Sequence, residues 1–249
     1  MSDGPGTLAI DIGGTGLKAV LLDAAGRMLG ERERIDTPHP CPPQTLVSSL
    51  MKLTGGLTGY GRVSVGFPGV VREGRVLTAP HFPAGDWRGF PLAATLAERL
   101  GRPVRLLNDA EVQGLGIVEG RGLEVVLTLG TGVGSAVFSD GALSPHLELA
   151  HHPLRKGKTY NEYVGEAARR KLGRRKWNRR LRRVIDTVEA LLHYDVLYLG
   201  GGNSRAVDRD LPDNVHLASN DAGLTGGIRL WDPAVWNAVP GRSAHSGFA

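Results

Sequence analysis

Two glycine-rich segments of the chain contain residues that could bind phosphate groups. The first, DIGGTGLK, begins at Asp11 and ends at Lys18, and the second is TLGTGVG. Their turn residues are Gly13, Gly14 and Thr15 in the first segment and Gly130, Thr131 and Gly132 in the second. Glycines let backbone N–H groups approach an anion closely, and the Asp11 carboxylate could hold Mg²⁺ directly or through water. Each segment alone also fits an ordinary glycine turn, and Lys18 could contact phosphate or point to solvent, but the pair predicts two loops that hold a polyphosphate group.

A third segment, LLNDAEVQG, places Asn108 and Asp109 where an apolar strand opens into a loop. Reacting groups usually occupy this position in open α/β sheets. A carboxylate there can accept the proton of a hydroxyl that attacks phosphorus, while the neighbouring amide holds an adjacent hydroxyl. Asp109 could equally be the N-cap of the helix that follows. The residues alone leave both interpretations open.

The segment LELAHHP brings together Glu148, His151 and His152. A Glu and a His three positions apart could bind a metal, but no third ligand is obvious nearby, so hydrogen bonds to a polyhydroxyl ligand are the better use. Cys41 is the only cysteine, which excludes an internal disulfide and a thiolate zinc site. We therefore expect no structural zinc.

The apolar runs around these motifs indicate how they are positioned. Runs at 8–12 and 17–22 flank the first glycine turn, and runs at 125–129 and 134–138 flank the second, so both are predicted to be β-hairpins. A further run from Met28 extends the first hairpin into a meander. Two such hairpins suggest a duplicated lobe. With a helix from Pro91 to Leu100 between strands, the pattern predicts an α/β chain with mixed sheets.

The segment RRKLGRRKWNRRLRR, residues 169–183, carries ten Arg and Lys side chains and no acid. Because the whole chain has a net charge of +5, the remaining residues sum to −5, and the basicity is local. Gly173 is predicted to separate an earlier helix, containing Val164, Ala167 and Ala168, from a later one. The apolar face of the later helix would consist of Trp177, Leu181, Val184, Ile185, Val188, Leu191 and Leu192. The basic residues could bind a polyanion or form a solvated helix face.

Taken together, the motifs resemble those of the ROK family of sugar kinases, and most of all its polyphosphate glucokinase branch. The matching segments, in order, are DIGGTGLK, GFPGVV, LLNDAEVQGLG, TLGTGVGSA, ELAHHP, YLGGGNS and NDAGLTGGI, and they span about residues 7 to 231. The resemblance implies a two-lobed ribonuclease H-like (actin-like ATPase) fold, with the substrates in the cleft between the lobes. We expect lobes at 1–109 and 110–236, a helix near 221–231 that packs back on the first lobe, and a disordered tail at 237–249.

The resemblance also implies roles for individual residues. Asp109 would be the general base for a sugar hydroxyl, and Asp11 would help to hold Mg²⁺. Other sugar hydroxyls would contact Asn108, Glu148, His151 and Glu162. The donor phosphates would contact Asp11, Gly13, Gly14, Thr15, Lys18, Gly130, Thr131 and Gly132, and the nucleoside would lie near Gly200, Gly201 and Gly202.

We therefore expect a sugar kinase that uses polyphosphate, ATP or both to phosphorylate a sugar, most simply O6 of glucose. The segment APHFPAGDW replaces an Asn-containing segment of the family, which keeps another hexose or an amino sugar open as substrate. A different class is a non-catalytic sugar sensor that binds polyanions through its Arg-rich face.

The resemblance implies a homodimer. DNA-binding members of the family carry an N-terminal helix-turn-helix, whereas ten residues precede Asp11 here, so nucleic acid is not an expected partner. A signal peptide and an apolar run of about 18 residues are both absent, and we expect a cytoplasmic protein without a membrane span.

Overall fold

The structure is a computed structural model that describes residues 6–82, 86–219 and 222–240. The described residues form two compact units. Unit 1 contains those up to Gly116 and from Gly223 onward, and unit 2 contains those from Ile117 to Ala222. The boundary that we expected after Asp109 therefore lies after Gly116, because helix α3 (Asp109–Leu115) packs on strands of unit 1. Of the expected tail at 237–249, residues 241–249 lie outside the described part of the chain.

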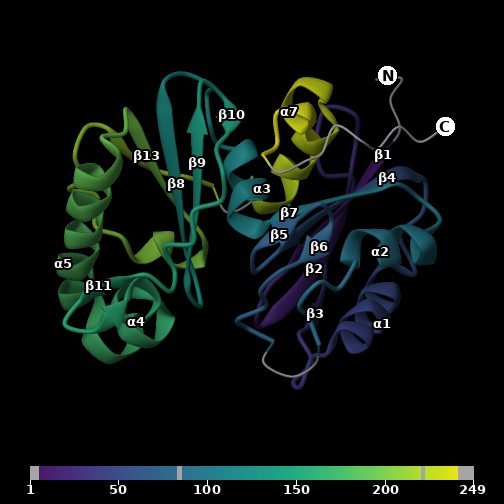
Figure 1. Cartoon of the computed structure of the whole chain (residues 1–249), viewed down its shortest axis with the longest axis horizontal. Helices are drawn as coiled ribbons and strands as arrows, with labels where there is room; N and C mark the ends of the chain where they lie inside the picture. Colours follow the sequence, from purple (N-terminus) through teal and green to yellow (C-terminus); the bar gives the residue numbers. More distant parts are fainter. Residues whose placement is uncertain (1–5, 83–85, 220–221, 241–249) are drawn as a thin grey trace. The chain divides into compact units, whose positions relative to one another are not determined.

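Unit 1 is built on a mixed five-stranded sheet with the order β3-β2-β1-β4-β7 (Figure 1). The first three strands of the chain form an antiparallel meander, and β4 and β7 extend the other side of β1 in parallel. The strands are β1 (Gly6–Ile12), β2 (Gly16–Leu22), β3 (Glu33–Asp36), β4 (Tyr60–Phe67) and β7 (Val104–Asn108), with β5 (Val71–Arg72) and β6 (Arg75–Val76) as a separate pair. The helices are α1 (Pro43–Thr54), α2 (Leu92–Leu100), α3, α6 (Ala222–Thr225), η2 (Gly226–Trp231) and α7 (Pro233–Asn237).

The third strand of the meander begins later than the apolar pattern indicated. Met28 makes only an isolated bridge to Leu22, and the ladder with β2 resumes at Glu33. Gly30, with φ of 103°, interrupts the extended backbone between them. The expectation of a strand from Met28 was therefore wrong by several residues.

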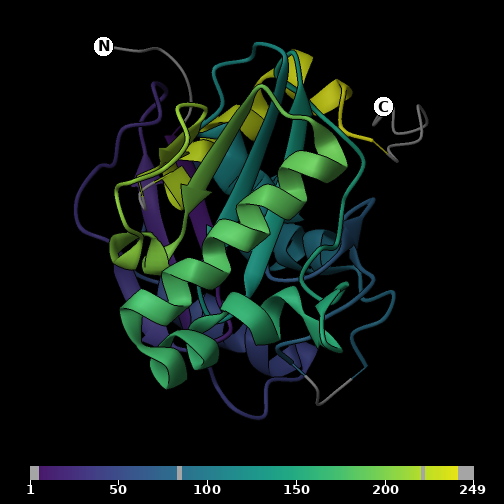
Figure 2. The same ribbon diagram turned by 90° about the vertical axis from the view of Figure 1, so that its left-hand side faces the viewer.

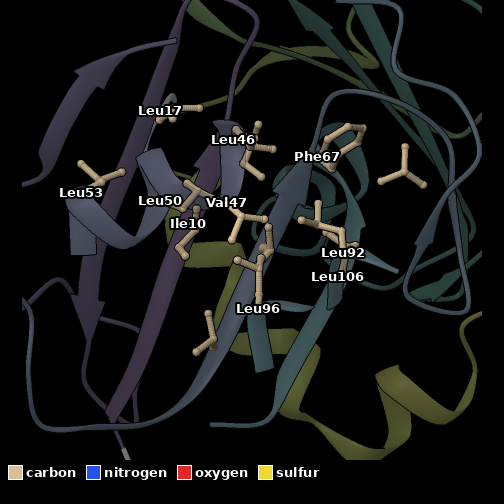
Figure 3. Packing of buried hydrophobic residues seen from close by; sticks show 14 of the residues in the cluster. Ile10, Leu17, Leu46, Val47, Leu50, Leu53, Phe67, Leu92, Leu96 and Leu106 are labelled. Atoms are coloured by element: carbon tan, nitrogen blue, oxygen red, sulfur yellow. The ribbon is translucent and has the colours of Figure 1, made fainter. Parts of the chain in front are cut away.

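The main core of unit 1 lies between its sheet and the helices α1 and α2. Leu46 and Leu50 of α1 and Leu92 and Leu96 of α2 are fully buried among inward-facing strand residues such as Ile10 (Figure 3). Burial of each such side chain is worth about 1.5–3 kcal/mol. The strands that carry the first glycine turn therefore belong to the most firmly packed part of the unit.

The segment after Gly223 covers the opposite face of the same sheet. Leu224 packs with Ala9, Val20 and Leu22. Ser64 Oγ of β4 donates a hydrogen bond of 2.6 Å to the Gly227 carbonyl and accepts one of 2.9 Å from Trp231 Nε1. The two ends of the described chain are thus joined in one unit.

Unit 2 repeats the strand plan of unit 1, with the order β10-β9-β8-β13-β14. Its first three strands again form an antiparallel meander, and β13 and β14 again add in parallel. The strands are β8 (Leu123–Leu129), β9 (Val133–Ser139), β10 (Ala142–Leu143), β13 (Val196–Gly200) and β14 (Val215–Leu217), with β11 (Pro153–Arg155) and β12 (Lys158–Thr159) as a separate pair. The helices are α4 (Tyr160–Val164), α5 (Glu166–Leu192) and η1 (Gly202–Ala206). The duplicated mixed sheets inferred from the two hairpins are confirmed.

Helix α5 runs along one face of the unit 2 sheet (Figure 2). Gly173, with φ 70° and ψ 163°, breaks it, so the expected separation at this glycine is confirmed. The segment before Gly173 is not the single helix that we expected. Val164 is the last residue of α4, Gly165 follows it, and Ala167 and Ala168 lie in the first turn of α5. Leu191, expected on the buried face, is 56% exposed, whereas Asn178 is buried. Within the described residues, the structure has no helix long and apolar enough to cross a membrane.

Candidate active site

Loop 1, residues 13–15, closes the β1–β2 hairpin of unit 1. The Gly13 amide donates to the Gly16 carbonyl at 3.0 Å, which forms the turn. Thr37 braces the loop, because its hydroxyl donates to the Gly13 carbonyl at 2.7 Å and its amide donates to the Thr15 carbonyl at 3.3 Å. Among the described residues, the amides of Gly14 and Thr15 have no hydrogen-bond partner. A braced turn with two available amides is suited to an anion.

An ion pair lies at the base of loop 1. The ladder places Asp11 directly opposite Lys18, and Lys18 Nζ donates to Asp11 Oδ2 at 2.8 Å. The two side chains are 20% and 39% exposed, so the pair is accessible. The sequence left open whether Lys18 contacts a phosphate or points to solvent. In the structure its ammonium group is hydrogen-bonded to the Asp11 carboxylate.

Loop 2, residues 130–132, closes the β8–β9 hairpin of unit 2. The Gly130 amide donates to the Gly132 carbonyl at 2.9 Å. At the start of α5, the Glu166 amide donates to the carbonyls of Gly130 at 3.1 Å and Thr131 at 3.3 Å. In the described part of the chain, the amides of Thr131 and Gly132 have no hydrogen-bond partner. Loop 2 thus presents the same pair of available amides as loop 1, but a helix terminus braces it.

Two asparagines that the sequence reading missed also hold loop 2. Asn203 Nδ2 donates to the Gly130 carbonyl at 3.0 Å. Asn161 Oδ1 accepts from the Val133 amide at 2.6 Å, and a Cβ on Gly132 would lie only 2.6 Å from the same oxygen. Asn203 directly follows the glycine triplet of YLGGGNS, and this position is the sequence feature that could have pointed to it.

The glycine triplet at 200–202 packs against the strand that leads into loop 2. Gly201 has φ 80° and ψ 169°, a conformation that is essentially restricted to glycine. A Cβ there would lie 2.5 Å from the Leu129 carbonyl oxygen. The middle glycine is therefore required for close backbone contact. A place for the triplet near a nucleoside stays a prediction.

Asn108 is the N-cap of α3. Its Oδ1 accepts from the Ala110 amide at 2.9 Å, and the Asn108 amide donates to Glu111 Oε2 at 3.1 Å, which completes a capping box. Asn108 Nδ2 donates to the carbonyls of Phe67 and Gly69. The side chain is buried, and its amide group is used to join β4, β7 and α3.

Asp109 is the first residue of α3 and not its cap. Its Oδ1 lies 2.9 Å from the Ala110 amide, which it shares with Asn108, and the residue is half buried. Gly66 of β4 lies against it, because a Cβ at Gly66 would be 3.3 Å from the Asp109 Cα. The N-terminal end of a helix stabilises a carboxylate in its ionised form. Asp109 thus stands at the helix start, with one carboxylate oxygen accepting from the Ala110 amide and its backbone packed closely against Gly66.

Glu148 lies in a group with two histidines of unit 2. Its Oε2 is 3.5 Å from His146 Nε2, and His151 is close enough to act on its charge. Partial burial would raise the pKa of Glu148, but the nearby imidazoles of His146 and His151 outweigh burial and lower it. Glu148 is thus an ionised acceptor, as a hydroxyl ligand requires. The sequence reading missed His146, two residues before Glu148.

Glu162 belongs to a second capping box, at the start of α4. Glu162 Oε2 accepts from the Thr159 amide at 2.9 Å, and the Thr159 hydroxyl accepts from the Glu162 amide at 3.3 Å. The backbone hydrogen bond from Thr159 is the main cause of the lowered pKa of Glu162. One carboxylate oxygen is therefore engaged in capping. A contact with sugar stays a prediction.

Asp11 is a possible ligand for Mg²⁺ near loop 1. Asp11 provides one hard carboxylate at the end of β1, and Mg²⁺ at phosphoryl-transfer sites usually takes one or two carboxylates together with substrate phosphates and water. Within the residues that the structure describes, no three His, Cys, Asp or Glu side chains gather as a metal-binding group. The residues thus fit a cation carried mainly by the donor phosphates.

Comparisons with known proteins agree on one family. The model described as the ROK family matches residues 7–146. The chain is 33% identical over 213 residues to a polyphosphate glucokinase of Mycobacterium tuberculosis (strain CDC 1551 / Oshkosh), an alignment that covers 82% of this chain and 80% of that protein. It is 37% identical over 142 residues to an N-acetylmannosamine kinase of Escherichia coli (strain SE11), with 55% and 48% covered.

A solved structure extends this likeness to three dimensions. The inorganic polyphosphate/ATP-glucomannokinase from Arthrobacter sp. strain KM superposes with a TM-score of 0.81 at 32% identity, over 90% of this chain and 97% of that chain. The mixed sheets flanked by helices are thus those of the actin-like ATPase fold. The fold implied by the motifs is confirmed.

Proposed function

Because this chain belongs to the ROK family and is a glucokinase-like sugar kinase, a phosphotransferase with an alcohol acceptor, we propose that it phosphorylates O6 of glucose with Asp109 as general base. The donor would be ATP, inorganic polyphosphate or both. The sugar hydroxyl would attack the terminal phosphorus of the donor while its proton passes to the Asp109 carboxylate. The bond from that phosphorus to the donor oxygen would break, leaving sugar phosphate and a donor shortened by one phosphoryl group.

The observation that carries this proposal is that residues other than Asp109 cap the start of α3. Asn108 and Glu111 close the capping box, so the Asp109 carboxylate is not needed as a cap. Asp109 nevertheless has a defined position, because its Oδ1 accepts from the Ala110 amide and its backbone packs closely against Gly66. A general base has to be positioned within hydrogen-bond reach of the hydroxyl, and a carboxylate on a rigid helix start meets that need.

The two loops would bind the donor phosphates through the amides of Gly14, Thr15, Thr131 and Gly132. Asp11 would hold Mg²⁺, which when bound neutralises charge on the transferring group. Lys18 would keep the Asp11 carboxylate in place and partly neutralised before the donor arrives. Catalysis would then consist mainly of positioning and electrostatic stabilisation.

A second candidate function is phosphorylation of another hexose or an amino sugar. Its support is the similarity to an N-acetylmannosamine kinase and to a glucomannokinase. The segment APHFPAGDW, which departs from the family pattern, contributes to this candidate, but residues 83–85 of it lie outside the described part of the chain.

A product assay separates these alternatives. Purified protein with Mg²⁺ is given glucose, mannose or N-acetylmannosamine, each with ATP and with long-chain polyphosphate, and phosphorus NMR identifies the phosphorylated oxygen. We expect glucose 6-phosphate as the main product, formed by the unaltered chain and not by Asp109→Asn. A clearly faster reaction with an amino sugar would favour the second candidate, and phosphorylation at another oxygen would overturn the O6 assignment.

A further inference from the structure

Nine of the ten cations of residues 169–183 fall into two classes in the structure. One class already has a partner. Glu166 pairs with Arg169 at 2.7 Å and Arg170 at 2.6 Å, and Arg180 lies over the Tyr163 ring at 4.6 Å. Two further pairs, Arg174 with Asp208 at 3.3 Å and Arg182 with Asp210 at 2.7 Å, complete this class. These five side chains stabilise unit 2 locally and are only partly available to a ligand.

The second class forms a line on α5. Arg175, Lys176, Arg179 and Arg183 are exposed, and in the described part of the chain no ion pair or hydrogen bond involves their side chains. We call these four residues the open stripe. At about 100° per residue they occupy roughly a 100° arc, and Arg175 and Arg183 are about 12 Å apart along the axis. Lys171, the tenth cation, has no ion pair with any described residue, but it precedes the break at Gly173.

The open stripe has a fixed orientation because the opposite face of α5 is buried. Trp177 is fully buried and donates from Nε1 to the Val164 carbonyl at 2.8 Å, and Leu181, Val184 and Val188 pack into the core of unit 2. The part of α5 before the break at Gly173 braces loop 2 through the Glu166 amide, and the Trp177 hydrogen bond to Val164 ties the part after the break to α4. The stripe and loop 2 therefore belong to connected elements of unit 2.

We propose that the open stripe is a binding site for inorganic polyphosphate, separate from the loops that would hold the reacting phosphates. The proposal rests on the proposed function in taking polyphosphate as a donor. Each internal phosphate of such a chain carries a negative charge, so a row of unpaired cations can hold several of them at once. The stripe retains the distal part of a long chain and raises the local concentration of its end.

The stripe favours a polyanion without bases over a nucleic acid. Proteins that bind single strands combine basic grooves with exposed aromatic rings on which bases stack. Trp177 is the only aromatic residue of 169–183, and it is buried on the opposite face. The exposed face therefore offers charge and guanidinium hydrogen bonds to phosphate but no surface for stacking.

A matched pair of double variants tests the proposal. Arg175→Gln with Arg179→Gln removes two stripe charges, and Arg174→Gln with Arg182→Gln removes two charges from paired residues of the same helix. Glutamine has nearly the helix propensity of arginine, so both should fold. For the stripe variant we expect about a tenfold rise in KM for long-chain polyphosphate and less than about a twofold change for ATP or tripolyphosphate. The control should stay within about threefold for every donor.

Direct binding separates this proposal from the proposed function. Long-chain polyphosphate is titrated onto the unaltered chain and both variants at two salt concentrations, which needs no turnover. Salt-sensitive binding that weakens only in the stripe variant supports the stripe, even if no donor gives product. Equal weakening in both variants, unchanged binding in the stripe variant, or equally tight binding of a single-stranded RNA of the same charge would overturn it.

Discussion

The two hairpins that end in glycine loops share their ladder but differ in chemistry. In unit 1 the pair preceding the last rung is Asp11 opposite Lys18, and in unit 2 the corresponding pair is Thr128 opposite Gly134. The first pair is an accessible ion pair, whereas in the second the Thr128 hydroxyl accepts from the Gly134 amide at 3.1 Å. At this position the hairpin of unit 1 thus has two charged side chains, whereas the hairpin of unit 2 has only neutral groups.

The groups that hold the two loops in place also differ. Loop 1 is held by Thr37 and by His39, whose Nε2 lies 3.0 Å from the Gly14 carbonyl oxygen, whereas loop 2 is held by the start of α5 and by Asn161 and Asn203. Duplication therefore supplied two similar backbones, and the side chains around them have diverged. Under the proposed function, Asp11 and Asp109 of unit 1 would hold the cation and accept the proton, and the loop 2 amides of unit 2 would bind donor phosphate.

Among the comparisons between the two units, the largest effect is expected at the pair where the hairpins differ most. Asp11→Asn removes the proposed Mg²⁺ ligand and should lower kcat/KM by about 10²–10³-fold with either donor. Thr128→Val removes one neutral hydrogen bond and should lower it less than about threefold, with a stability loss of about 1 kcal/mol. Steady-state rates at saturating Mg²⁺ test both variants. Equal losses would show that the two hairpins contribute alike.

In the glycine triplet at 200–202, substitution by alanine should be most destabilising at Gly201. Gly201→Ala places a Cβ 2.5 Å from the Leu129 carbonyl oxygen in a backbone region that alanine avoids. We expect a loss of about 3 kcal/mol in the free energy of unfolding. Gly202→Ala is the matched control, since a Cβ there meets nothing within 4 Å and should cost less than about 1 kcal/mol. Urea midpoints measure both, and a tolerated Gly201→Ala would contradict the packing role.

Among the described residues, each unit has one capping box, and the buried one should matter more. Asn108→Ala removes the cap of α3 and the hydrogen bonds to Phe67 and Gly69, for an expected loss of about 2 kcal/mol. Thr159→Ala removes the exposed cap of α4 and should cost about 1 kcal/mol or less. Thermal unfolding at one pH compares the two. A larger loss for Thr159→Ala would reverse the ranking.

The smallest effect concerns pH. The side-chain hydrogen bond from Arg169 is the main reason that the pKa of Glu166 falls from its usual 4.5 to about 2. Because the folded-state pKa is the lower one, the stabilisation is complete above about pH 4.5 and is lost as pH falls toward 2. Glu166→Gln should therefore cost about 1 kcal/mol or less at pH 7 and progressively less below pH 4.5. Denaturant titrations at pH 7 and pH 3 measure the difference, and a cost that grows on acidification would contradict the ion pair.

Much of the fold could be predicted because it depends on local patterns. Apolar runs flanking glycine turns marked β1, β2, β8 and β9, and the helical spacing after Trp177 marked the buried face of α5. The expectation for Leu191 was wrong, since it is 56% exposed, although the next residue, Leu192, still packs against the core of unit 2. Periodicity describes the face of a helix but does not specify how far the partner surface extends.

The site was less predictable because its residues act through contacts that are remote in sequence. A sugar contact of Asn108 stays a prediction, and the sequence did not indicate that its buried amide joins β4 to α3 through carbonyls about forty positions away. Asn161 and Asn203 brace loop 2 from two elements that follow it by dozens of residues. No local motif distinguishes such an asparagine from a ligand-binding one, since both present the same donors and acceptors.

The most direct test of the central claim is the single-turnover rate of glucose phosphorylation by the unaltered chain and Asp109→Asn. Asparagine keeps the size of the side chain, and the cap at Asn108 should preserve the fold, which circular dichroism and the urea midpoint check. With ATP or polyphosphate, the account predicts a rate lower by about 10²–10⁴-fold and little change in glucose affinity. A rate within a few-fold of the unaltered chain, in a variant that folds and binds glucose, would show that Asp109 is not the base.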